Sequence, residues 1–257
     1  MKKVFSEINI NNGDTVLVSS DILKILLYNK KVESKISPDN IIDMLKEKIG
    51  NTGNLLFPTY NWSFCEGKEF DYKNTKSLCG TLSNIALQRK DFKRTKNPIY
   101  SFTVYGKDME HITNLDHKDC FSFNSPFGYL IEKKAKNLFI NLHYRVGGFP
   151  FVHVVEQKVG VNYRFKKNFK SFYVDKNNTK TMKTFSMFVR DISKNIGTTF
   201  IKEEFDDVLK EKKAFNTSKI LDGSSEVNII EIATAFDLLV KNLSNKGNYI
   251  YSAKINE

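Results

Sequence analysis

Short hydrophobic runs rich in β-branched residues alternate with amphipathic stretches along the first part of the chain. Residues 15–18 predict a buried strand, and residues 54–57 predict a second strand that a proline ends. Between them, Ser37 as N-cap, Pro38 at the first helical position and Gly50 as the stop predict an amphipathic helix. A strand, a helical crossover and another strand predict a βαβ unit with parallel pairing and a buried central sheet.

The same alternation continues further along the chain. It predicts strands at 100–105, 137–142, 227–230 and 248–251, and helices from Ser125-Pro126 to about 134, from about 149 to 159, at about 201–210 and at 233–243. The fold class that we expect is α/β, with a mixed, largely parallel central sheet flanked by helices. We expect a single domain over residues 1–257, with a less regular subregion around 165–225.

The composition is that of an ordinary folded protein. With 257 residues, 40% of them hydrophobic, the chain can bury a substantial core. The three cysteines, Cys65, Cys79 and Cys120, are widely spaced and lack a CxxC, which indicates neither a disulfide framework nor a thiolate zinc site. The first 14 residues lack the apolar run of a secretory signal, and no later stretch reaches the length of a membrane span. We therefore expect a cytoplasmic protein that does not enter the membrane.

The formal net charge of +11 favours a polyanionic partner, which could be nucleic acid, a membrane surface or a phosphorylated cofactor. Basic residues cluster at 89–96 and at 164–170, but acidic residues interrupt most other runs and no nucleic-acid-binding module is recognisable. A lysine-rich solvated surface explains the same charge without any such partner. Charge alone therefore does not select a function.

The first candidate site is the end of the strand at 15–18, where Ser19, Ser20 and Asp21 follow. A helix N-terminus presents unpaired N–H groups, so such a turn can bind a phosphate or an anionic oxygen, and serine hydroxyls add donors. The alternative is that these residues only cap the next helix. Neither a P-loop nor a GxGxxG motif is present.

The second candidate is the pair His153 and Glu156. Three residues apart on a helix, the imidazole and the carboxylate lie on one face, and the carboxylate can hold the tautomer of a histidine that acts as general base. The alternatives are a surface ion pair, or half of a metal site completed by His143. A third candidate is the adjacent pair Asp116 and His117, which can orient a substrate amine or simply close a turn.

Several separated blocks occur in an order and spacing that resemble the aminoglycoside 3-N-acetyltransferase family from about residue 13 to 245. They are residues 18–20, 53–59, 70–75 with Gly80, 94–98 with Ser101 and Gly106, Asp116-His117, Ser125-Pro126, His153-x-x-Glu156 and residues 160–164. The chain departs from the family pattern at Val18, Asn97 and Pro150. The resemblance implies an acyltransferase that moves an acetyl group from acetyl-CoA to an amine.

The resemblance also implies roles for individual residues. His153 is the general base, oriented by Glu156 or by another acidic residue such as Asp71 or Asp116, with no metal and no covalent intermediate. The pantetheine arm of acetyl-CoA lies near Ser19 and Ser20, which are also candidate donors to the developing oxyanion. The remaining expected cofactor-binding residues are Arg94, Ser101 and Ser125, and the expected acceptor-binding residues are Tyr60, Asp116 and His117.

Two kinds of acceptor remain open, and one rival function. Aminoglycosides are polycations that call for an acidic site, whereas this chain is basic, so a nucleotide-linked amino sugar of a surface-glycan pathway is the preferred acceptor and an aminoglycoside the other. The rival is a non-catalytic protein that keeps the fold and binds RNA or another polyanion. The sequence leaves the choice between monomer and homodimer open.

Overall fold

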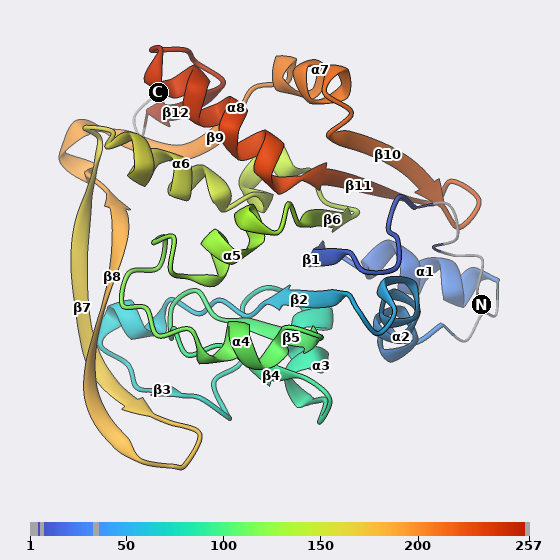
Figure 1. The fold of residues 1–257 in the computed structure, drawn as a ribbon, viewed down its shortest axis with the longest axis horizontal. Coiled ribbons are helices and arrows are strands. Elements are labelled where there is room, and N and C mark those ends of the chain that lie inside the picture. The colour runs from blue at the N-terminus through green and yellow to red at the C-terminus, as the bar shows by residue number, and fades with distance from the viewer. Residues whose placement is uncertain (1–4, 6–7, 33–35, 255–257) are drawn as a thin grey trace.

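A computed structural model describes residues 5, 8–32 and 36–254, and its elements are arranged around one central sheet (Figure 1). Within this part of the chain, the sheet has seven strands in the order β10-β11-β6-β1-β2-β5-β4. Their bounds are β1 Thr15–Ser20, β2 Asn54–Pro58, β4 Lys93–Arg94, β5 Phe102–Gly106, β6 Lys136–Ile140, β10 Phe215–Ile220 and β11 Ser225–Glu231.

Strand direction in this sheet changes from the centre to the edges. The pairs β6-β1 and β1-β2 are parallel, and the four outer pairs are antiparallel. Of the seven described strands, β10, β6, β1, β2 and β4 therefore run in one direction and only β11 and β5 in the other. The prediction of a mixed, largely parallel sheet flanked by helices is confirmed, including the parallel βαβ unit at its centre.

The central strands are buried on both faces, and their residues alternate between two hydrophobic cores. In β1, Val16 and Val18 face one core and Leu17 faces the other. The first core, which contains Val16 and Val18, also includes side chains of helices α1 Leu23–Lys31, α2 Pro38–Ile49 and α3 Thr81–Gln88. The second core, which contains Leu17, includes side chains of helices α4 Met109–Asn114, α5 Pro126–Glu132, α6 Phe151–Val159, α7 Glu204–Glu211 and α8 Ile232–Ser244. Burial on both faces explains why these strands are continuous hydrophobic runs.

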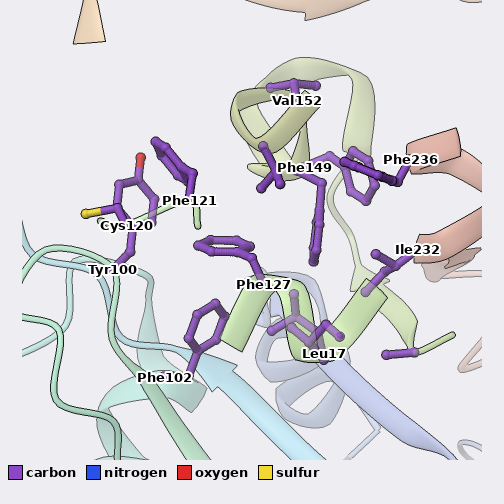
Figure 2. Close-up of a cluster of buried hydrophobic side chains, with 14 of the residues drawn as sticks. Leu17, Tyr100, Phe102, Cys120, Phe121, Phe127, Phe149, Val152, Ile232 and Phe236 are labelled. Atoms are coloured by element: carbon purple, nitrogen blue, oxygen red, sulfur yellow. The ribbon is translucent and has the colours of Figure 1, made fainter. Parts of the chain in front are cut away.

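The second core contains a cluster of aromatic rings between the sheet and α6. Figure 2 shows Tyr100, Phe102, Phe121 and Phe127 side by side, with Phe149 nearby at the turn that precedes α6. The rings of Phe102 and Phe127 are 5.2 Å apart in a T-shaped arrangement, and those of Phe121 and Phe127 are 5.6 Å apart. Such pairs add stabilisation beyond the area they bury, so the cluster fixes the position of α6 on the sheet.

Residues 164–201 differ most from the expectation. A long hairpin of β7 Arg164–Val174 and β8 Lys180–Arg190 runs along one side of the molecule, at the left of Figure 1. It forms a sheet with β3 Phe70–Asp71, and β9 Ile196–Ile201 pairs with β12 Ile250–Lys254. The expected helix at 201–210 begins only at Glu204, so the prediction was wrong at Ile201, which lies in β9.

Among the described residues, no helix is both long enough and apolar enough to cross a bilayer. The expectation that the chain has no secretory signal concerns residues 1–14, of which 1–4 and 6–7 lie outside the described residues.

Candidate active site

A cavity of about 550 Å³ opens beyond the carboxyl ends of the parallel strands β1, β2 and β6. Ligands of α/β proteins bind preferentially at this edge, where the chain leaves the sheet on both sides. Its walls include the polar side chains of Ser19, Ser20, Tyr60, His153, Arg164 and Arg190.

His153 and Glu156 form a hydrogen-bonded pair at the wall of this cavity. His153 lies in the first turn of α6 and keeps 23% of its side chain exposed, whereas the side chain of Glu156 has no exposed surface. The imidazole Nδ1 is 2.8 Å from Oε2 of Glu156, and the ring packs on Phe121 with centroids 5.4 Å apart. The alternative of a surface ion pair is therefore wrong, because the carboxylate is buried behind the imidazole.

Glu156 has a second partner besides His153, the positively charged Arg164 at the start of β7. The Nε of Arg164 is 2.7 Å from the same Oε2 atom, and only 6% of the Arg164 side chain is exposed. Burial pushes the pKa of Glu156 up, but the hydrogen bond and charge of His153 and the charge of Arg164 outweigh it and lower the pKa. The carboxylate is therefore ionised and acts only as an acceptor, so the proton of the hydrogen bond lies on Nδ1 and Nε2 faces away from Glu156.

A second cavity, of about 350 Å³, lies on the hairpin side of His153. It shares His153, Tyr100, Arg164 and Arg190 with the larger cavity but not Ser19 or Ser20. The imidazole thus lies at the junction of two spaces, which is the arrangement that a reaction between two bound molecules requires.

Comparison with known proteins identifies the family. The sequence model described as aminoglycoside 3-N-acetyltransferase matches residues 30–244, which is most of the chain. The chain belongs to the aminoglycoside 3-N-acetyltransferase family. It is therefore an N-acetyltransferase by family membership, and the resemblance found in the separate blocks is confirmed.

Solved structures of similar fold include several aminoglycoside 3-N-acetyltransferases. AAC-IIIb, in a binary complex with CoASH, has a TM-score of 0.75 at 15% identity and covers 96% of each chain. Sisomicin-bound AAC-VIa has a TM-score of 0.74 at 13% identity, covering 96% of this chain and 97% of its own. The YokD protein from Bacillus subtilis has a TM-score of 0.71 at 17% identity, covering 95% and 97%. No curated protein matches this chain in a sequence search.

The two serines of the first family block belong to a strand, whereas they were expected at the turn between a strand and a helix. Ser19 and Ser20 are the last residues of β1, and both line the larger cavity. Helix α1 begins at Leu23 without a side-chain cap, and Asp21 accepts a hydrogen bond from the Leu23 N–H. The serines therefore do not cap the helix, and the alternative that they serve only as caps is wrong.

The other residues expected to bind the cofactor are parts of buried networks. The Arg94 guanidinium donates to the carbonyls of Thr59 and Thr75 and to the hydroxyl of Ser101, and burial lowers its pKa to about 10. Ser125 caps α5 by accepting from the Phe127 N–H. The structure places these side chains in the interior, away from both cavity walls.

The residues expected to contact the acceptor, and the second candidate carboxylate, are spread out. Tyr60 lines the larger cavity with its hydroxyl buried. Asp116 is exposed beside Lys118, and His117 is buried with Nδ1 at 2.9 Å from the carbonyl of Asp119. The Asp71 carboxylate accepts the N–H groups of residues 73 and 74 in its own turn. Glu156, and neither Asp71 nor Asp116, contacts His153.

His143 does not join the His153 pair, as a metal site would require. Its ring stacks on Tyr144, and its Nε2 is 3.8 Å from a carboxylate oxygen of Asp206. Over the residues that the structure describes, no group of three or more His, Cys, Asp or Glu side chains is placed to hold a metal ion.

Two cavity residues, Arg164 and Arg190, were missed as functional candidates. Arg164 ends the last family block, next to Tyr163, and that position is the signal that marks it in the sequence. Arg190 lies directly opposite Arg164 in the β7-β8 pairing, 26 residues later in the chain, and no local pattern marks it. Only the hairpin brings the two side chains to the same place.

Proposed function

We propose that this protein transfers the acetyl group of acetyl-CoA to the amine of an amino sugar, with His153 as general base. The observation that carries the proposal is the imidazole at the junction of two cavities, held by the buried carboxylate of Glu156. Support for the two substrates comes from relatives of the same fold, of which AAC-IIIb was solved with CoASH and AAC-VIa with sisomicin.

The proposed reaction is a direct attack of the amine on the thioester. The neutral amine adds to the carbonyl carbon while Nε2 of His153 takes a proton from its nitrogen. The C–S bond then breaks, and the CoA sulfur leaves with the proton that the imidazolium returns, giving the N-acetyl product and CoASH. Glu156 stabilises the imidazolium between these steps, because its carboxylate stays ionised beside Nδ1.

Ser19 and Ser20 supply the hydroxyl groups in this proposal. They lie in the larger cavity at the end of β1, where they can bind the pantetheine arm or donate to the oxygen that becomes negative during the attack. A covalent acyl-cysteine has no support, because the only cysteine on the wall of that cavity is Cys79. Burial raises the pKa of its thiol and keeps it protonated.

The acceptor in this proposal is an amino sugar of one of two kinds, an aminoglycoside or a nucleotide-linked sugar of a surface-glycan pathway. We place the reaction in the cytoplasm, where acetyl-CoA is available.

The test is thiol release from acetyl-CoA by the wild type and His153→Ala, screened against aminoglycosides and nucleotide-linked amino sugars. Loss of the base is expected to lower kcat about 10² to 10⁴-fold. His111→Ala, at an exposed histidine of α4, is the matched control and is expected to keep full activity. Equal turnover by His153→Ala and the wild type, with circular dichroism showing both folded, would refute the role of His153.

A further inference from the structure

We propose that the acceptor carries an anionic group of the phosphate or diphosphate class, and that Arg190 binds this group in the second cavity. The inference rests on the proposed acetyl transfer and specifies its acceptor. It assigns a function to a side chain that the reaction itself does not use.

The two cavities differ in what they offer a ligand. The larger one contains Ser19 and Ser20 at the end of β1, the place proposed for the arm of acetyl-CoA. The second one is lined by Phe121, by residues 187–190 of β8 and by Ile192, and it reaches His153 from the hairpin side. Once acetyl-CoA fills the larger cavity, the second cavity is the remaining approach to Nε2 and therefore the place for the acceptor.

The charges around both cavities suit an anion. Among the described residues that line them, the charged side chains besides His153 are Arg145, Arg164 and Arg190, and none is a carboxylate. The nearest buried carboxylate, Glu156, is already compensated by the charge of Arg164 and hydrogen-bonded to His153. A polycationic acceptor would enter a site without counter-charges, which costs binding energy.

Two carboxylates further from the cavities, Asp206 and Asp119, are also compensated. Arg145 lies 3.5 Å from Asp206, and Asp119 lies 2.7 Å from Nζ of Lys166 and accepts a hydrogen bond from Gln157. Neither carboxylate is therefore available to hold an ammonium group of the acceptor.

Arg190 is the cation that an anionic group can reach. Arg164, directly opposite it across the β7-β8 pair, is engaged by Glu156, whereas the side chain of Arg190 makes no ion pair or hydrogen bond with any described residue. Like charges directly opposite in an antiparallel pair destabilise it. An anion on Arg190 removes this repulsion and gains a bidentate, charge-assisted interaction with the guanidinium.

The experiment measures binding with CoA already bound. Trp62, the single tryptophan of the chain, lines the larger cavity, and its ring lies 6.1 Å from that of Tyr100, which lines both cavities, so its fluorescence reports on binding in either. Glucosamine, glucosamine 6-phosphate, UDP-glucosamine and the polycation tobramycin are titrated in saturating CoA. We expect the phosphorylated sugars to bind at least about tenfold more tightly than glucosamine, and Arg190→Gln to remove about tenfold of that affinity.

The control is Lys170→Gln, which removes an equally exposed positive charge of β7 that lies outside both cavities. It is expected to leave every affinity unchanged, so a general charge effect is separated from a local one. Tighter binding of tobramycin than of the phosphorylated sugars would overturn the inference. So would failure of the phosphorylated sugars to bind in saturating CoA, or an Arg190→Gln effect confined to the affinity for CoA.

The same titrations distinguish failure of this inference from failure of the proposed function. If UDP-glucosamine or glucosamine 6-phosphate binds through Arg190 beside CoA but acetyl-CoA gives no turnover with any acceptor, the acetyl transfer is refuted and the anion site stands. If glucosamine, which carries no phosphate, is acetylated as efficiently as its phosphorylated forms, the acetyl transfer stands and the anion site is refuted.

Discussion

Glu156 is a buried carboxylate that contacts both the proposed general base and the start of the β7-β8 hairpin. Its Oε2 atom lies 2.8 Å from His153 Nδ1 and 2.7 Å from Arg164 Nε, so one oxygen contacts both the imidazole and the guanidinium. Removing one member of a buried charged group leaves the others without compensation, which is more costly than losing an exposed pair. At this scale the same contact orients the base and holds the start of β7 against α6.

We expect Glu156→Gln to lower both activity and stability. The amide keeps the shape but does not stabilise the imidazolium, and it leaves Arg164 buried without its counter-charge. The free energy of unfolding at pH 7 is expected to fall by about 3–5 kcal/mol, as measured by urea denaturation. Glu132→Gln, at an exposed carboxylate of α5, is the control and is expected to unfold like the wild type.

The stability difference between the wild type and Glu156→Gln is also expected to depend on pH. The folded state lowers the pKa of Glu156 below its ordinary 4.5, so its contribution to stability is full above that value and is lost as pH falls through the folded pKa. Urea denaturation at a series of pH values is expected to show the difference shrinking only below about pH 4.5. A constant difference down to pH 3 would contradict this account.

Individual helices follow from local sequence chemistry. In α2, the Ser37 hydroxyl accepts the Asn40 N–H while the Asn40 side chain accepts the Ser37 N–H, and Pro38 occupies the first turn. Ile41, Ile42, Leu45 and Ile49 are all buried on one face, as their spacing predicts. The helix was therefore predicted correctly from its N-cap to its final glycine.

Ser37→Ala is expected to destabilise the protein by about 1 kcal/mol, because the first turn loses its capping hydroxyl. Ser37→Gly is expected to cost less relative to the wild type, since glycine is tolerated at this position without a side-chain bond. Thermal unfolding followed by circular dichroism measures both. Equal losses in the two variants would show that the hydroxyl is not what stabilises this helix start.

The β7-β8 hairpin was missed because it lacks one hydrophobic face. Most side chains of β7 are exposed, and only Ser171 and Tyr173 are buried, so neither a period of two nor one of 3.6 is evident. Its position depends on contacts with distant segments. The Ser171 hydroxyl donates to the carbonyls of Gly67 and Lys68, and the Tyr173 hydroxyl to the carbonyl of Lys96.

At the scale of the whole molecule, the positive charge has two competing explanations. A polyanion-binding protein would use it as a general surface, whereas the proposed enzyme uses particular cations for phosphate groups of its substrates. A specific ligand that binds only the folded state raises the melting temperature, and an equally charged molecule without a site does not.

We expect CoA to stabilise the folded protein specifically. At a CoA concentration 100 times its Kd, the stabilisation is about 2.7 kcal/mol, which raises the Tm of a chain of this size by about 5 °C or more. ATP at the same concentration is the polyanion control and is expected to give a much smaller shift. Equal shifts with both, each abolished by moderate salt, would favour the polyanion-binding protein instead.

The sequence by itself determined the βαβ centre, helix α2 from its N-cap to its final glycine and the pairing of His153 with Glu156. These features depend on residues close together in the chain, through hydrophobic period, caps and helical spacing. It also carried the ordered blocks that indicate the family.

The tertiary structure alone decided which of the candidate residues meet. Arg94 and Ser101 belong to a block that resembles the family pattern but are turned into the interior, whereas Arg190 joins the site from a hairpin without any pattern. The physical reason is that neighbours across a cavity are set by strand order, strand direction and the register of β7 with β8. None of these is encoded in the spacing of residues along one segment.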